Sequence, residues 1–116
     1  MKVMLWKPGV YDSTRGELPT IGPAILATSA IEAGHDAFIV DHHFSPPPED
    51  KIETEATDIL AAEKPDLLCI SAVSHEWRMS RVQAVLDLAH DMAIPIWVGG
   101  PHALAFWDIL EKDERV

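Results

Sequence analysis

Four short apolar runs, separated by longer amphipathic segments, constrain the fold of this chain more than any other feature of its sequence. The runs occupy residues 3–6, 37–40, 67–70 and 94–98. Continuous runs of this length, rich in branched side chains, are typical of parallel strands that are covered on both faces. The sequence therefore predicts four strands of one parallel sheet.

The segments between these runs have the pattern of amphipathic helices. Pro23 suits a first helical turn, and Gly34 suits the end of the same helix. Apolar stripes at helical spacing are formed by Ile25, Thr28 and Ile31; by Ile52, Ala56, Ile59 and Leu60; by Val82, Val85, Leu86 and Ala89; and, after Pro101, by Phe106, Trp107 and Leu110. Strands that alternate with helices in this way predict an α/β fold with right-handed crossovers, that is, a doubly wound parallel sheet in three α/β/α layers.

The chain length predicts a single domain over residues 1–116. A doubly wound sheet normally continues to a fifth strand, whereas residues 112–116 have the polar composition of a turn after a helix. We therefore expect a fragment of a longer protein that is truncated before a fifth strand.

Charge and cysteine content exclude several classes of function. The net charge of -10 disfavours nucleic acid and anionic membrane surfaces as partners, because both would repel the chain. No apolar run approaches the length of a membrane span, which is about 20 residues. Cys69 is the single cysteine, so the chain by itself can form neither an internal disulfide nor an iron–sulfur cluster. We expect a cytoplasmic protein in which Cys69 is a small buried residue.

Ligands of open α/β sheets bind beyond the carboxyl ends of the strands, where the strand order reverses. The loops expected there comprise residues 7–20, 71–76 and 99–102. The first of them is longer than most loops of this kind, which suggests that it covers a ligand. Motifs for a dinucleotide, for a P-loop and for a phosphoacceptor receiver domain are not present in the sequence.

Small residues follow the third and fourth predicted strands. Ser71, Ala72 and Ser74 leave room for a slot between strand ends, although ordinary packing would also explain them. Gly99 and Gly100 permit either a positive φ or a close approach of a ligand to the backbone. A tight turn explains one glycine more easily than two.

Three stretches of the sequence resemble the cobalamin (vitamin B12)-binding domains of radical S-adenosylmethionine (radical SAM) proteins. They are residues 18–23 with the segment that continues to residue 41, residues 64–71, and residues 94–103, which read IPIWVGGPHA against the IPVVVGGPHA of that family. The resemblance covers nearly the whole chain in the same order. Its members include proteins similar to the anaerobic magnesium-protoporphyrin IX monomethyl ester cyclase and radical methyltransferases.

The resemblance implies a flavodoxin-like, or Rossmann-like, domain that holds cobalamin. The corrin would lie over the carboxyl edge of the sheet, and the nucleotide tail would enter the crevice beneath it. The residues expected at the cofactor are Thr14, Gly16, Ser71, Ala72, Ser74, Gly99, Gly100 and His102. Stand-alone cobalamin modules carry D-x-H-x-x-G, whose histidine coordinates cobalt, whereas this chain has Thr14 in that place. We therefore expect no histidine lower ligand.

The same resemblance places the chemistry outside this chain. The 4Fe-4S cluster and S-adenosylmethionine would belong to a downstream radical SAM barrel domain of the same protein, which would be the partner of this domain. By itself the chain is expected to catalyse nothing, while its parent protein would be an oxidative cyclase or a methyltransferase.

Two alternatives remain open from the sequence. The triplet of Asp41, His42 and His43 resembles the signature of a metal-dependent phosphoesterase family, although adjacent histidines before a proline-rich loop are more often solvated. The chain could instead be a degenerate docking module that binds no cofactor, with an exposed Trp77 at the interface. Trp6, Trp97 and Trp107 are expected to be packing residues.

Overall fold

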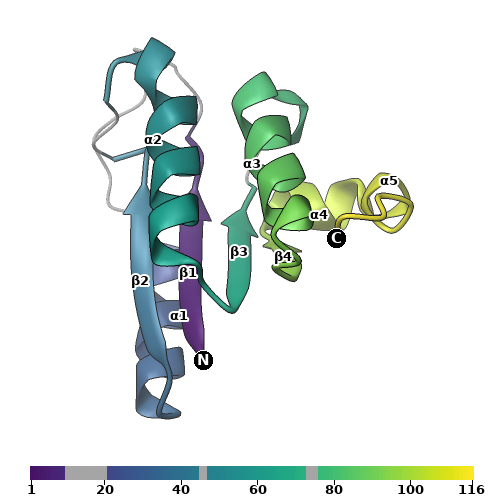
Figure 1. Ribbon diagram of the computed structural model, residues 1–116. Helices are drawn as coiled ribbons and strands as arrows, with labels where there is room; N and C mark the ends of the chain where they lie inside the picture. Colours follow the sequence, from purple (N-terminus) through teal and green to yellow (C-terminus); the bar gives the residue numbers. More distant parts are fainter. Residues whose placement is uncertain (10–20, 45–46, 73–75) are drawn as a thin grey trace.

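The computed structural model describes residues 1–9, 21–44, 47–72 and 76–116 as a three-layer α/β domain (Figure 1). Its strands are β1 (Lys2–Lys7), β2 (Asp36–Asp41), β3 (Leu67–Ser71) and β4 (Ile96–Gly99). Its helices are α1 (Ile21–Glu32), α2 (Glu49–Glu63), the single 3-10 turn η1 (Glu76–Arg78), α3 (Ser80–Asp91), α4 (Pro101–Ala105) and α5 (Trp107–Leu110). The predicted alternation of strands and helices is confirmed.

The four strands form one parallel sheet with the order β2-β1-β3-β4. Leu5 of β1 pairs with Ile39 on one side and with Cys69 on the other, and Cys69 pairs with Trp97 of β4. The chain first moves from β1 to β2 and then crosses back to β3 on the other side of β1. The strand order therefore reverses between β1 and β3, which is the position where α/β sheets bind their ligands.

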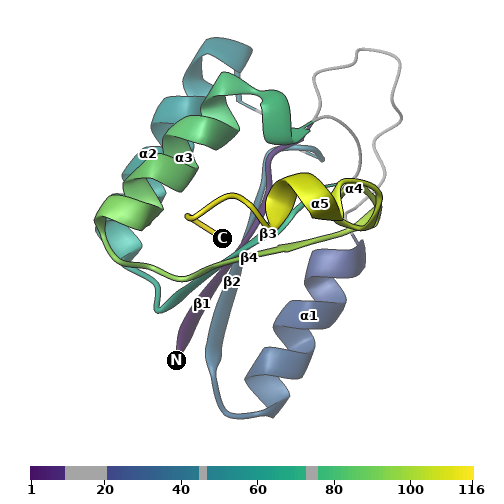
Figure 2. The same cartoon turned by 90° about the vertical axis from the view of Figure 1, so that its right-hand side faces the viewer.

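The two faces of the sheet are covered to different extents (Figure 2). Helices α2 and α3 lie on one face, where they bury Met4, Trp6, Leu68 and Ile70 in the main core. Helix α1 lies on the opposite face and contacts β1 and β2. Its smaller core contains Val3, Leu5, Ala27 and Leu67. On the face where α1 lies, β3 and β4 remain accessible, and a pocket can form there.

Two of the predicted helices differ from the structure in their buried residues. Helix α1 buries Pro23 and Ala27, while Ile25 and Ile31 of the predicted stripe are exposed. Because α1 is apolar on all sides, spacing alone does not identify its packed face, and small Ala27 allows a close approach to the sheet. The predicted last helix is broken at Phe106 into two short helices. Among their described side chains, only Leu110 is buried in the core.

The tryptophans also differ from expectation. Trp6 is fully buried, as predicted, but the side chains of Trp97 and Trp107 are 66% and 64% exposed. Trp77, expected as an exposed interface residue, is buried in the main core. Its position follows from η1, which turns the side chain toward the sheet before α3 begins.

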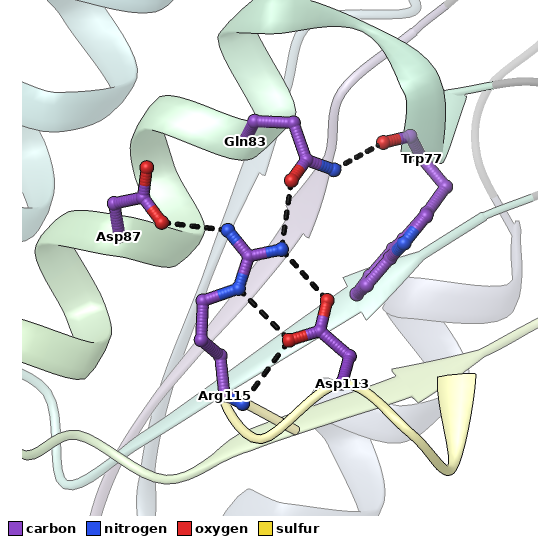
Figure 3. Close-up of polar contacts among 5 residues, drawn as sticks. All are labelled: Trp77, Gln83, Asp87, Asp113 and Arg115. Carbon is purple, nitrogen blue, oxygen red and sulfur yellow. Dashed lines mark hydrogen bonds and ion pairs between the residues drawn. The ribbon is translucent and has the colours of Figure 1, made fainter. Parts of the chain in front are cut away.

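A polar network attaches the C-terminal segment to α3 (Figure 3). Arg115 donates hydrogen bonds to both carboxylate oxygens of Asp113, to Asp87 and to Gln83. The amide of Gln83 in turn donates to the backbone carbonyl of Trp77 at 2.5 Å. The hydrogen bonds of Arg115 hold the pKa of Asp113 below its ordinary value. The network therefore connects the last residues of the chain to η1.

The search for membrane spans, made over the described residues, identifies no helix with the length and apolar character that crossing a bilayer requires.

Candidate ligand-binding site

A pocket of about 270 Å³ opens between α1 and the β3–β4 half of the sheet. Its lining residues are Leu5, Trp6, Gly22, Pro23, Leu26, Cys69, Ile70, Ser71, Trp97, Val98, Gly99 and Gly100. The pocket exists because α1 covers β1 and β2, and leaves the neighbouring strands accessible on the same face. It lies at the carboxyl ends of the strands, where the strand order reverses.

The two consecutive glycines at the end of β4 lack a side chain for different physical reasons. Gly100 has a φ of 102°, and a Cβ atom there would lie 2.4 Å from the carbonyl oxygen of Ala72. A tight turn thus accounts for Gly100. A Cβ atom on Gly99 would meet no atom within 4 Å, and the same holds for Gly22 at the start of α1. Both glycines line the pocket, and a Cβ atom at either would enter space that no protein atom occupies.

The structure brings together four of the residues that the sequence assigns to the cofactor. Ser71, Gly99 and Gly100 line the pocket. Ala72 is fully buried beside it, and its backbone N–H donates to the carbonyl of Gly99 at 2.9 Å. Thr14, Gly16 and Ser74 lie outside the described residues, and His102 lies in α4 with its side chain outside the description. The cofactor contacts of all eight residues remain predictions.

The walls of the pocket are mainly apolar. Trp97 of β4 and Leu26 of α1 both line it and are more than half exposed. Cys69 on β3 also lines the pocket, is half-buried, and has a pKa raised by burial. A thiol with a raised pKa is a poor nucleophile at neutral pH, so Cys69 is a wall residue of the pocket.

Two buried charged residues have no counterpart among the sequence predictions. Lys7, the last residue of β1, is only 3% exposed, and its ammonium lies 3.3 Å from the carbonyl oxygen of Ser71. Arg81 at the start of α3 is also buried, and donates to the carbonyl of Gly9 at 2.8 Å. The available signals were a lysine directly after a buried strand, and an arginine beside Val82 on a buried helix stripe.

The metal interpretation of the Asp41 triplet lacks support from the contacts of its members. One oxygen of Asp41 accepts the backbone N–H groups of His43 and Phe44. His42 is buried, contrary to the expectation of solvated histidines, and its Nδ1 accepts the indole N–H of Trp6. In the part of the chain that the structure describes, no three His, Cys, Asp or Glu side chains are grouped so that they could hold a metal ion.

The tautomer of His42 follows from its neighbours. Because Nδ1 accepts from Trp6 at 3.0 Å, the ring proton is carried by Nε2, which donates to Glu55 at 3.0 Å. Both ring nitrogens are therefore engaged in a bridge between β1 and α2. His42 is a structural residue of the core.

Fold and pocket together define the class of protein: a flavodoxin-like α/β domain with a pocket at the switch point of a parallel sheet. Comparison with protein-family models identifies a B12 binding domain over residues 8–115. The chain belongs to this family, and the cobalamin-binding part of the sequence-based resemblance is confirmed. Searches among curated proteins and among solved structures return no match.

The described residues fit the nucleotide tail of a cobalamin. A flat heteroaromatic base needs an apolar pocket, and this pocket of about 270 Å³ is lined mainly by apolar side chains, Trp97 and Leu26 among them. Gly22 and Gly99 add backbone without side chains to the pocket lining. The ligand of the family and the shape of the pocket are therefore compatible.

Proposed function

We propose that this domain holds cobalamin for a radical SAM enzyme, with the nucleotide tail in the pocket between α1 and β3–β4. The observation that carries the proposal is the open space at Gly22 and Gly99, in a pocket at the switch point of a B12-binding domain. Bound cobalamin would supply a cobalt-carried methyl group or an electron carrier to the partner. The residues of the chain would bind the tail, orient the corrin and exclude water from the base.

Three of the described histidines, His35, His42 and His90, have positions or contacts that do not suit a lower ligand of cobalt. His42 is engaged by Trp6 and Glu55, and His35 contacts the N-terminal amine at the amino end of the sheet. His90 lies near the end of α3, on the other face of the sheet from the pocket. We infer that none of these three coordinates cobalt.

The partner in this proposal is a radical SAM barrel that carries the 4Fe-4S cluster and S-adenosylmethionine. Support comes from the resemblance of residues 94–103 to that family and from apolar side chains exposed on the helices after β4. Leu104, Trp107 and Ile109 are 86%, 64% and 48% exposed. A partner domain over the carboxyl edge of the sheet would bury them.

The test is a titration of the purified chain with hydroxocobalamin under anaerobic conditions, followed by absorbance and calorimetry. The single cysteine gives a reading at the site itself, because Cys69 lies in the pocket wall. We expect saturable binding that slows alkylation of Cys69. Binding that leaves the alkylation rate unchanged would place the ligand elsewhere, and no binding would contradict the function.

A matched pair of variants distinguishes the pocket from the rest of the surface. Gly99→Leu fills the pocket without meeting any protein atom near its Cβ position, so it should abolish binding and preserve the fold. Ala62→Leu adds an exposed leucine on α2, on the opposite face of the sheet, and should bind like the wild type. Equal binding by both variants would exclude this pocket.

A further inference from the structure

Trp97 presents an exposed aromatic ring to the pocket. Among the described lining residues the aromatic ones are Trp6, which is fully buried, and Trp97, which is 66% exposed. Strand pairing places Trp97 in one row with Cys69 and Leu5, so these three side chains share a face of the sheet. Because Leu5 and Cys69 belong to the smaller core under α1, Trp97 extends that row onto β4, beyond the strands that α1 covers.

The indole of Trp97 is not engaged by the fold. Among the described residues it takes part in no hydrogen bond, aromatic pair or cation–π contact, whereas the indole of Trp6 donates to His42. Its neighbours Ile96 and Val98 pack into the main core on the opposite face and so hold β4 in place. A tryptophan that remains two-thirds exposed contributes little of its large apolar surface to the core. Both the edge and the faces of this ring are therefore available to a ligand.

The pocket lining beside Trp97 has few side-chain atoms. Gly99 follows Trp97 by two positions on β4 and therefore lies on the same face of the sheet, and the small Ser71 is its strand partner. A Cβ atom on Gly99 would meet no protein atom within 4 Å. A flat ring can thus lie against the indole without displacing a side chain at these positions.

Aromatic side chains bind flat heteroaromatic bases by stacking, which needs no particular pattern of hydrogen bonds. The overlap of two stacked rings increases with the number of fused rings in each of them. Indole has two fused rings, so a base with two fused rings gains more from stacking on Trp97 than a base with a single ring.

We propose that Trp97 stacks on the base of the nucleotide tail and makes a base of two fused rings a determinant of corrinoid recognition. This inference rests on the proposed cobalamin function and deepens it, because it names the class of base that the pocket selects. Trp97 is a binding residue and takes no part in the coordination of cobalt.

The experiment measures the affinities of three corrinoids: cobalamin, whose base has two fused rings; p-cresolylcobamide, whose tail ends in a single ring; and cobinamide, which lacks the tail. Each variant is compared with the wild type for the same ligand, because the work of displacing the base from cobalt differs among corrinoids. Trp97→Leu should weaken cobalamin by about tenfold or more, p-cresolylcobamide by about threefold and cobinamide by less than about twofold. Trp97→Phe keeps an aromatic ring and should lose less cobalamin affinity than Trp97→Leu.

The matched control is Trp107→Leu, which removes a tryptophan of similar exposure, 64%, from α5 and outside the pocket lining. It should bind all three corrinoids like the wild type. If the wild type binds cobalamin and Trp97→Leu loses the same factor for all three ligands, or nothing, the role of Trp97 is overturned and the function stands. If the wild type binds no corrinoid, both fall.

A measurement on the wild type does not depend on the folding of any variant. The indole N–H resonance of Trp97 is identified by its absence from the spectrum of Trp97→Leu. Because the ring current of a stacked base changes the resonance of the indole, this signal should move more with hydroxocobalamin than with cobinamide. Equal movement would place the corrin, and not the base, against Trp97 and would overturn the proposal.

Discussion

Arg81 on α3 donates a hydrogen bond of 2.8 Å to the carbonyl of Gly9, which fixes the direction in which the chain leaves β1. The guanidinium is buried, and a second interaction reaches Glu49 at the start of α2 at 3.8 Å. Gly9 has a φ of 73°, and a Cβ atom there would lie 2.5 Å from the carbonyl oxygen of His42. One cation thus connects the ends of three elements at the carboxyl edge.

Replacement of Arg81 by methionine should lower the free energy of unfolding by about 2 kcal/mol, because the carbonyl of Gly9 would be left buried without its donor. Urea denaturation followed by circular dichroism measures this change. Arg78→Met, at an exposed position of η1, is the matched control and should stay within about 0.5 kcal/mol of the wild type. Equal midpoints for the two variants would contradict the role of Arg81.

Alanine substitutions at the adjacent glycines should have opposite outcomes. Gly100→Ala should destabilise the domain by about 2 kcal/mol or more, because of its positive φ and the contact with the Ala72 carbonyl. Gly99→Ala should cost less than about 1 kcal/mol, since its Cβ would face open space. Thermal unfolding of both variants is the measurement. A similar loss in both would show that the turn, not the pocket, requires both glycines.

The hydrogen bond between Trp6 and His42 should be detectable by a double-mutant cycle. His42→Leu leaves the buried indole N–H of Trp6 without an acceptor and should cost about 2 kcal/mol. The same change in a Trp6→Phe background should cost less, because the N–H is no longer there. Unfolding free energies of the four proteins give the coupling, and additive effects would exclude the bond.

Asp113 should contribute to the stability of the folded state at neutral pH but not in strong acid. Hydrogen bonds from Arg115 hold the pKa of Asp113 below its ordinary value, so its ionised form stabilises the folded state. This contribution is fully present above the unfolded pKa of about 3.9 and is lost as the pH falls through the lower folded pKa. Asp113→Asn should therefore destabilise by about 1 kcal/mol at neutral pH, and the difference should disappear in strong acid.

The control for this pH dependence is Glu114→Gln, which removes the adjacent exposed carboxylate. It should leave the pH dependence of the melting temperature close to that of the wild type. A constant difference between Asp113→Asn and the wild type at all pH values would show that the Arg115 network acts through packing and not through charge.

The sequence alone determined the strands, their parallel arrangement and the family. The apolar runs at residues 3–6, 37–40 and 67–70 fall within β1, β2 and β3, because a strand covered on both faces needs a continuous apolar run. Ser71 and Gly99 were predicted to lie at one edge because the carboxyl ends of parallel strands meet there, and both line the pocket. These are local patterns, and the parallel strand arrangement brings the residues that follow each strand to the same edge of the sheet.

Only the tertiary structure decided which faces are packed and which are open. Ile25 and Ile31 have the spacing of a buried stripe, yet Pro23 and Ala27 contact the sheet. Trp97 lies in an apolar run and is exposed, because α1 covers the other half of the sheet on that face. The hydrophobicity of a side chain determines how much free energy its burial would contribute, whereas the position of each helix decides which side chains are buried. For the same reason the burial of Lys7 and Arg81 could be recognised only after the strands and helices were placed.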